Sequence, residues 1–484
     1  MARTKLQTRK FILLAALAQL TLASRVVAQT TTSTAGELDA RLDAELGVPG
    51  GLTAETAAAR SRSTSNQVRA RRADVLAAAA DVDRAAAAYV PRVAALARYT
   101  RVSDESGDGN VSIVAAPAAG PGPLPAGTQL VNVPLEFPTI KNQYLFQASL
   151  SVPLSDYFTR IGPRHDAAKY GVRAAQLNET ATQQKTATDG RLAYYGWVRA
   201  KLDLIVAERA VAQSEAHLVD VRKAENAGSA TLADVLAVEA QRAQNVLFAE
   251  RARSLVRVTE EQLRTLMHDT RRSSLAIGEN VLTNPPRAGL PDSVDGLWNE
   301  AKLRRPELKA LSAQARALGF QADVERAGYL PRLDAFANGY YANPNQRVFP
   351  QQDAFRSSWD LGLQLSWTLS DVPGAAASGR NVDAQQASVL AERAAFADSL
   401  RIEVTEAREQ EIQANAAVQA TAEQRVAAEE AYRVRRALFQ VGRATSVELT
   451  DAETGLTRAR LDALRARVDQ RVARARLLYA LGRG

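Results

Sequence analysis

Hydrophobic and polar side chains alternate along two short stretches that lie far apart in the chain. In the first stretch the apolar positions fall on every second residue from 144 to 152. In the second stretch they are Trp359, Leu361, Leu363, Leu365, Trp367 and Leu369. A period of two places apolar side chains on one face of a strand and polar ones on the other. We therefore predict strands at 144–152 and 359–369, with weaker candidates at 93–101 and 333–341.

Alanine-rich segments occupy most of the remaining chain and predict long helices at 52–89, 163–225, 231–267, 294–328, 374–440 and 443–481. The segment 163–225 alone would extend about 90 Å at ~1.5 Å per residue. Pro91 and Pro331 end two of these helices just before a predicted strand, because proline lacks an amide donor and clashes with the preceding turn. Residues 102–142 are rich in Gly, Pro, Ser and Asp, so no regular structure is expected there.

Three landmarks recur in the same order and indicate a duplicated unit. The phrases AYVPRV (from Ala88) and GYLPRL (from Gly328) come first, and LSVPLSD (150–156) and LSWTLSD (365–371) follow. Glycine turns at Gly228 and Gly442 then interrupt each helical stretch. We expect a first repeat at 52–268, a linker at 269–293 and a second repeat at 294–481, after a poorly ordered leader at 29–51.

The first 28 residues have the pattern of a signal peptide. Basic residues precede an apolar run from Phe11 to Leu22, and small residues end at Ala28. The run is too short to span a bilayer as a helix, so cleavage after Ala28 is expected. Five basic residues and no acid lie in this segment, which leaves a net charge of +3 of the total +8 for the rest. That weak charge gives no reason to expect nucleic-acid binding.

A ten-residue strand with one apolar and one polar face suits the wall of a membrane β-barrel. Four strands leave open edges, which lipid does not tolerate, so several chains would have to close the barrel together. An ordinary half-buried hairpin in a soluble domain has the same alternation. The helix pairs also need neighbouring helices to bury their apolar stripes. A coiled-coil structural protein would provide such neighbours too, so the helices alone do not decide between the two interpretations.

The repeated Tyr/Pro breaks, the LSxxLSD phrases, the glycine turns and the RRPEL phrase at 304–308 together make the chain resemble the TolC-family outer-membrane efflux proteins, over about 52–481. The resemblance implies a mainly α fold in which a homotrimer builds a 12-stranded β-barrel and a helical tunnel. It also implies an outer-membrane channel, extending into the periplasm, that works with a periplasmic adaptor and an inner-membrane pump in tripartite efflux or type I secretion. The alternatives are a periplasmic adaptor and a coiled-coil structural protein of the envelope. The side chains expected to face outer-membrane lipid are Tyr144, Phe146, Leu150, Leu361, Leu363, Leu365 and Trp367.

The resemblance also places functional residues at the helical turns. Two acids after the second turn, Glu448 and Asp451, match residues that constrict the periplasmic end of the tunnel. Their i, i+3 spacing puts them on one helix face, although acids at a helix start are also favoured by the helix dipole alone. The turn residues expected to contact an adaptor are Gly228, Ser229, Thr231, Gly442, Arg443 and Thr445.

Two departures from the family pattern concern the same turn. A Tyr and an Arg that often link neighbouring hairpins fall on Phe439 and Ala444 here. In the first turn, Asp234 matches Glu448, but Ala237 replaces the second acid.

The chain shows no pattern for catalysis, a cofactor or a metal site. It has no cysteine, and its three histidines, His165, His217 and His268, have no carboxylate or cysteine partner at ligand spacing. A phosphate-binding GxxxxGK[ST] loop is absent from the sequence, so a partner would have to supply energy.

Overall fold

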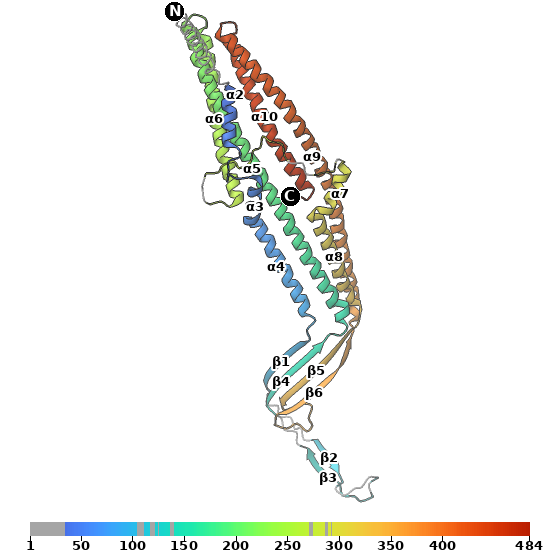
Figure 1. Cartoon of the computed structure of the whole chain (residues 1–484). Coiled ribbons are helices and arrows are strands. Elements are labelled where there is room, and N and C mark those ends of the chain that lie inside the picture. Colours follow the sequence, from blue (N-terminus) through green and yellow to red (C-terminus); the bar gives the residue numbers. More distant parts are fainter. Residues whose placement is uncertain are drawn as a thin grey trace, which may run out of the picture. The chain divides into compact units, whose positions relative to one another are not determined.

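The computed structural model in Figure 1 describes residues 34–103, 111–116, 122–123, 125–135, 140–270, 274–285, 289–291 and 293–484. The predicted signal peptide lies outside these residues. The chain divides into two compact units. One comprises Met1–Ala73, Gln176–Lys309 and Ala394–Gly484, and the other comprises Asp74–Ala175 and Ala310–Arg393.

Helices and strands follow one another in the same order twice (Figure 1). The first series is α3 (Ala54–Thr64), α4 (Asn66–Ala87), β1 (Arg92–Arg101), β4 (Asn142–Val152), α5 (Gly162–Asn226) and α6 (Leu232–Met267). The second series is α7 (Val294–Arg304), α8 (Pro306–Arg326), β5 (Arg332–Asn343), β6 (Arg356–Ser366), α9 (Val372–Gln440) and α10 (Ser446–Ala480). The mainly helical fold class predicted from the sequence is confirmed, while the exact repeat boundaries stay a prediction.

Each predicted first helix of a repeat is in fact two helices. Ser65 leaves the helical region (ψ 128°), and its hydroxyl oxygen accepts hydrogen bonds from the amides of Gln67 (3.2 Å) and Val68 (3.4 Å). This side chain therefore caps α4 as a new helix. In the second repeat Arg305 is extended (ψ 119°) because the following residue is Pro306 and proline disfavours a helical conformation in the residue before it.

Two segments expected to lack regular structure contain some. Within 102–142, β2 (Val111–Ala115) pairs antiparallel with β3 (Val131–Leu135). Within the expected leader, Thr34–Glu45 forms helix α2, whose residues Leu38 and Leu42 are buried. Leucines spaced four apart form one stripe on a helix, and the surrounding Thr and Gly obscure this stripe in the sequence.

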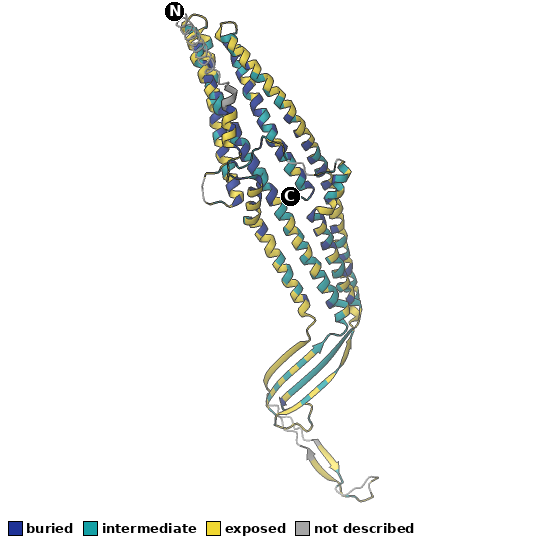
Figure 2. Cartoon of the chain, in the orientation of Figure 1, coloured by how far each residue is buried: buried dark blue, intermediate teal, exposed yellow. Residues whose placement is uncertain are grey.

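The unit that contains α2 is held by an aromatic and aliphatic core. Trp197 and Tyr194 of α5 are fully buried, and they cluster with Leu38 and Leu42 of α2 and Leu263 of α6. Figure 2 shows buried residues along these helices. Burying such aromatic side chains removes a large apolar area from water, so this cluster stabilises the unit.

The expected linker also belongs to this core. Ile277 and Val281 are completely or almost completely buried, and Ile277 forms a parallel bridge with Leu52. The bridge brings two backbones so close that a Cβ added at Gly278 would lie 2.3 Å from the carbonyl oxygen of Gly51. The two backbones approach each other too closely for a side chain at either position, so both residues must be glycine.

The RRPEL phrase fixes the junction of α7 and α8 to the end of the chain. The Arg305 guanidinium is buried, lies 4.6 Å from the Tyr479 ring centre and donates to the Tyr479 carbonyl at 3.0 Å. It also forms ion pairs with Glu307 (3.2 Å) and Glu403 (3.3 Å). Because these partners come from three helices, Arg305 joins segments that are far apart in the sequence.

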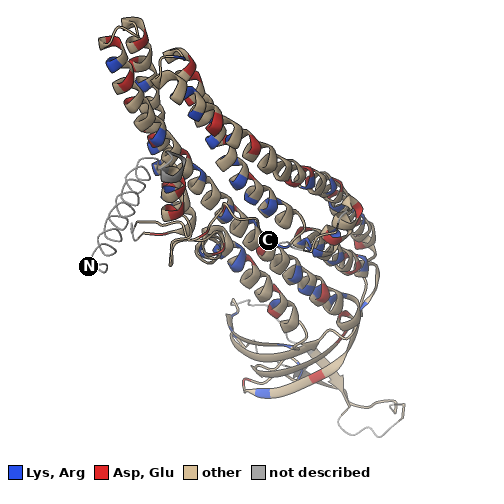
Figure 3. Cartoon of the chain, turned by 45° about the horizontal axis from the view of Figure 1, so that its top comes forward, with Lys and Arg blue, Asp and Glu red and all other residues tan. Residues whose placement is uncertain are grey.

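The other unit is built around an antiparallel four-stranded sheet in the order β1-β4-β5-β6. Figure 1 shows the four strands side by side. The two strand pairs of the repeats are joined through β4 and β5. In Figure 3 the strands carry few charged residues, whereas the helices carry many of both signs.

Candidate channel wall and hairpin tips

The register of the sheet places the predicted apolar side chains on one face. Residues directly opposite each other on antiparallel strands point to the same face. Leu150 is opposite Val93 on one side and Ala337 on the other, and Ala337 is opposite Leu361. The same holds along the strands, so one face combines the odd-numbered residues of β1, β5 and β6 with the even-numbered residues of β4. We call it the apolar sheet face.

The apolar sheet face is well exposed. Leu361, Leu363 and Leu365 are each more than two thirds accessible, and Val93, Tyr144, Phe146 and Leu150 are exposed as well. Trp367 lies one residue beyond β6 and is also exposed. In Figure 2 many positions on the strands are coloured as exposed. Large apolar side chains gathered on one open face indicate contact with lipid or with another protein surface.

The opposite face of the sheet is mainly polar, although Leu96 of β1 and Phe336 of β5 also lie on it. Gln147 and Ser149 of β4 lie on it, together with Asn338 of β5 and Asp360 of β6. The Asn338 amide donates to the Asp360 carboxylate at 2.7 Å, and Arg347 forms an ion pair with the same carboxylate. The two faces of the sheet thus differ in polarity.

Pro91 and Pro331 lie at the positions predicted for them. Pro91 stands between the end of α4 and the start of β1, and Pro331 stands between a 3-10 turn at Ala327–Tyr329 and the start of β5. Beside the first break, Tyr157 donates its hydroxyl to the Tyr89 carbonyl at 3.0 Å, and the two rings stack. The transition from helix to strand is therefore fixed by local side chains as well as by proline.

The two helical turns, which we call tip 1 (Ala227–Thr231) and tip 2 (Val441–Thr445), have the same construction. Gly228 and Gly442 have positive φ values of 76° and 72°. The amide after each glycine donates five residues back, from Ser229 to Ala224 (2.9 Å) and from Arg443 to Leu438 (2.8 Å). This is the Schellman arrangement that ends a helix at glycine.

A capping box then starts the returning helix at each tip. Thr231 and Asp234 exchange side-chain and backbone hydrogen bonds at the start of α6, and Thr445 and Glu448 do the same at the start of α10. The Asp234 carboxylate accepts hydrogen bonds from the Thr231 hydroxyl and the Thr231 amide. These bonds stabilise its ionised form and lower the pKa of Asp234, and the hydroxyl has the larger effect. The predicted tip residues Gly228, Ser229, Thr231, Gly442, Arg443 and Thr445 are all exposed.

The two acids predicted for the constriction differ in their surroundings. Glu448 accepts a hydrogen bond from the Thr445 amide at 3.1 Å and pairs with Arg435 at 3.3 Å. Asp451 lies one helical turn further on and is exposed. Glu448 thus has a local role at the start of the helix, in line with the alternative considered from the sequence, and a role of either acid in a constriction stays a prediction.

One buried polar cluster gives no signal in the sequence. Nδ1 of His217 on α5 lies 3.2 Å from the Glu453 carboxylate on α10, and Nε2 lies 3.4 Å from the Ser446 hydroxyl. All three side chains are buried. His217 thus has a carboxylate partner that spacing along the sequence does not indicate, because Glu453 lies 236 residues further along the chain. The ring also meets Phe439 edge to face at 5.4 Å.

Phe439 joins apolar residues from both helical hairpins. It packs against Val221 of α5 and Val235 of α6, and also against Tyr432 and Leu449 of the other hairpin. The phenylalanine that replaces the expected tyrosine thus contributes through packing. Together with the His217–Glu453–Ser446 cluster, it couples the two hairpins close to their tips.

Neither a membrane-spanning helix nor a metal-binding cluster is found among the described residues. No described helix is long and apolar enough to cross a bilayer. No group of three or more acidic or histidine side chains in the described part of the chain is arranged to hold a metal ion.

Comparison with known proteins gives one sequence match and several fold matches. Residues 297–483 match the family described as outer membrane efflux protein. The CmeC outer membrane channel of Campylobacter jejuni superposes with a TM-score of 0.72 at 11% identity, covering 89% of this chain and 86% of that one. The MtrE outer membrane channel of Neisseria gonorrhoeae gives 0.70 at 18% identity, with 89% and 88% covered. The chain has the fold of the TolC-family outer-membrane efflux channels.

The channel OprN also shares this fold, with a TM-score of 0.70, 18% identity, and 89% of this chain and 90% of that chain covered. The sequence matches no curated protein at significant similarity. The resemblance predicted from the repeated motifs is confirmed. The family match falls on the second repeat and is to efflux proteins rather than to enzymes.

Proposed function

We propose that the chain is an outer-membrane channel of a tripartite efflux system, extends into the periplasm and works as a homotrimer. The observation that carries the proposal is the sheet, where the large exposed apolar side chains of β4 and β6 gather on one face while the other face is mainly polar. Each strand of a barrel wall faces lipid on one side and water on the other, so its side chains must alternate between apolar and polar. The family match over 297–483 supports the efflux role.

The edges of the sheet favour assembly of several copies. In the sheet order β1-β4-β5-β6, strands β1 and β6 each have one sheet neighbour among the described residues. Unpaired backbone groups cannot face lipid, since each would lack a hydrogen-bond partner there. Pairing β1 of one copy with β6 of the next would satisfy them, and three copies would give a closed 12-stranded barrel.

The helices offer a second surface for such packing. Ile402, Ile412, Val426 and Val434 of α9 are exposed. At about 100° per residue these four side chains fall within roughly one third of the helix circumference. An apolar stripe of this width is typical of a helix that packs against a neighbour, and the adjacent copy is the neighbour we propose.

Cysteine cross-linking tests the assembly directly, because the natural chain contains no cysteine. A cysteine at Ala95 on edge strand β1 would be combined with a cysteine scan of 357–365 on edge strand β6. We expect oxidation to give covalent dimers and trimers at a few matched positions and at no others. A folded protein that remains monomeric by light scattering and forms no such products would refute the proposal.

We also propose that the tips meet a periplasmic adaptor, which in turn would contact an inner-membrane pump, and that Asp451 and Glu448 constrict the tunnel. Six carboxylates around a narrow opening would favour cation entry. Asp451→Ala should therefore reduce the cation selectivity of the channel in planar bilayers. Glu448→Asp is the matched control, since the aspartate at the equivalent position of tip 1 already forms the same capping box. Unchanged selectivity in Asp451→Ala would contradict the constriction.

A further inference from the structure

A small cavity lies between α2, α9, α10 and the segment 274–285. Its volume is about 180 Å³, which is below the size of pockets for drug-sized ligands. Five aliphatic side chains give it apolar walls: Leu38, Leu42, Leu282, Val418 and Leu464. All these residues belong to one compact unit.

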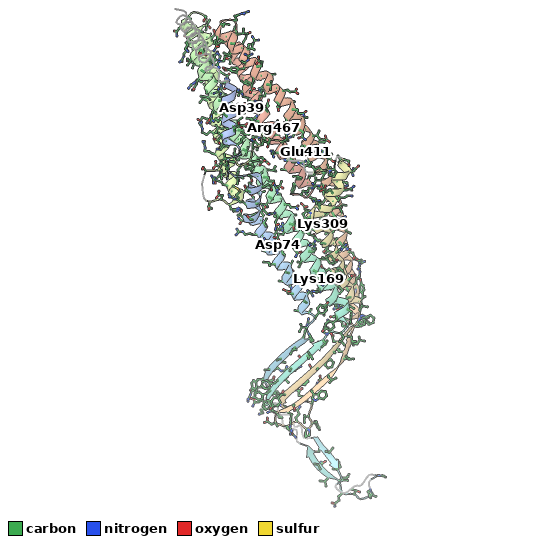
Figure 4. All side chains as sticks on the ribbon, in the orientation of Figure 1. Asp39, Asp74, Lys169, Lys309, Glu411 and Arg467 are labelled. Atoms are coloured by element: carbon green, nitrogen blue, oxygen red, sulfur yellow. The ribbon has the colours of Figure 1, made fainter. Side chains whose placement is uncertain are left out.

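The charges that line the cavity are mostly positive. Arg425, Arg460 and Arg467 face it together with a single acid, Asp39. Figure 4 labels Asp39 on α2 and Arg467 on α10. Arg467 donates a hydrogen bond to the neutral Asn284 side chain at 2.8 Å, and this contact leaves its charge uncompensated.

Arg460 is the least accessible of these cations. Its side chain is 4% exposed, and its Nε atom has no hydrogen-bond partner. The closest carboxylate, Glu429, lies 3.7 Å away and is shared with Arg425 at 3.2 Å. Burial lowers the pKa of Arg460, and Arg209 adds to this shift, while Glu429 and, more weakly, Asp39 oppose it. A buried cation with an incomplete partner set is unfavourable, so an additional anion in the cavity would be stabilised.

We propose that this cavity binds a small amphipathic carboxylate, with its charged group on Arg460 and Arg467 and its hydrocarbon part among the leucines. A guanidinium offers a planar fork of donors that matches a carboxylate. A neutral molecule would leave Arg460 with Glu429, which is 3.7 Å away and shared with Arg425, as its partner within ion-pair distance. An inorganic ion would leave the aliphatic walls unfilled. The site is separate from the tips and from the apolar sheet face, and it does not depend on the proposed channel function.

Calorimetric titration of the purified full chain in a non-ionic detergent tests the proposal, with hexanoate as the probe. Hexanol tests the contribution of the hydrocarbon part without the charge, and inorganic phosphate tests the contribution of the charge without the hydrocarbon part. We expect hexanoate to bind at least tenfold more tightly than either comparator. Equal binding of hexanol would show a merely apolar cavity, and equal binding of phosphate would show an unspecific anion site. Either result would overturn the proposal.

Two substitutions with opposite expected effects make the test specific. Arg460→Met should weaken hexanoate binding at least tenfold without unfolding the protein, because it replaces a buried charge by an apolar side chain of similar length. Asp39→Asn removes the only acid of the lining and should strengthen binding severalfold. Arg476→Met is the control, since Arg476 is on the same helix but lines a different cavity. If Arg460→Met and Asp39→Asn both bind hexanoate like the natural protein, the assignment is wrong.

Discussion

The orientation of the sheet in the membrane can be tested by a depth series of arginine substitutions. Leu361 is the central residue of the eleven in β6 and lies on the apolar sheet face, where it is 69% exposed. Leu363 and Leu365 lie on the same face, two and four residues further on. If this face contacts lipid, an arginine should be most costly at Leu361 and become less costly toward the end of the strand.

The magnitudes follow from strand geometry. A strand rises about 3.4 Å per residue, and a barrel strand is tilted by roughly 40°, so Leu363 and Leu365 lie about 5 Å and 10 Å in depth from Leu361. The apolar band of such barrels is about 25 Å tall, and arginine costs about 2–4 kcal/mol at its middle and about 0–1 kcal/mol near its edge. We therefore expect about 3 kcal/mol per chain at Leu361, an intermediate cost at Leu363 and under 1 kcal/mol at Leu365.

Denaturant unfolding of protein refolded into phospholipid vesicles would measure these costs. Gln364→Arg is the matched control, because Gln364 lies on the polar face opposite Asp334 and a new arginine there would meet an acid. Ser366 is less suitable, since it lies opposite Arg332. A similar cost at all three leucines, or a larger cost at Gln364 than at Leu361, would refute the assignment of the lipid face.

Three further predictions concern the helices and the core. Glu453→Ala leaves Nδ1 of buried His217 without its partner, so unfolding in denaturant should show a loss of about 1–3 kcal/mol, and a loss below 0.5 kcal/mol would contradict this. Gly278→Ala forces a Cβ against the Gly51 carbonyl and should lower the melting temperature, whereas Gly171→Ala, where the Cβ meets open space, should leave it unchanged or raise it. The lowered pKa of Asp234 means that its contribution to tip 1 is present above its ordinary pKa and is lost as the pH falls through its folded-state value. Hydrogen exchange of the Thr231 amide should accordingly lose protection on acidification, and Asp234→Asn should abolish that pH dependence.

The elements that sequence predicts well are those whose signal is local. All four strands of the sheet begin within three residues of their expected positions, and the helices after β4 and β6 end at the expected glycine turns. Alternation with a period of two and a helix-ending glycine are properties of adjacent residues, so they can be read without knowing the fold. The family resemblance rests on the order of the same local signals, which is why the sequence alone could indicate it.

The features that sequence does not reveal depend on single hydrogen bonds or on distant partners. The break between α3 and α4 rests on the Ser65 side chain. Ser65 lies in the run SRSTSN (61–66), where several residues are common helix caps, so the sequence does not single out the residue at which the helix breaks. Helix α2 is short, and its leucines are buried only because other parts of the chain cover them. His217 and Glu453 are separated by 236 residues, and their pairing cannot be inferred from ligand-type spacing.

The duplication itself separates what the tips need for folding from what they can use for function. Both tips contain a positive-φ glycine, a threonine three residues later and an acid three residues after that, with the same hydrogen bonds in each. A position that has the same structural role in both tips is already explained by the turn, and Glu448 is such a position. Asp451 has no acidic counterpart, since Ala237 occupies the equivalent place. Phe439 and His217, which couple the hairpins, also lie outside this shared framework. The differences between the tips therefore mark Asp451, rather than Glu448, as the acid that the turn geometry does not require.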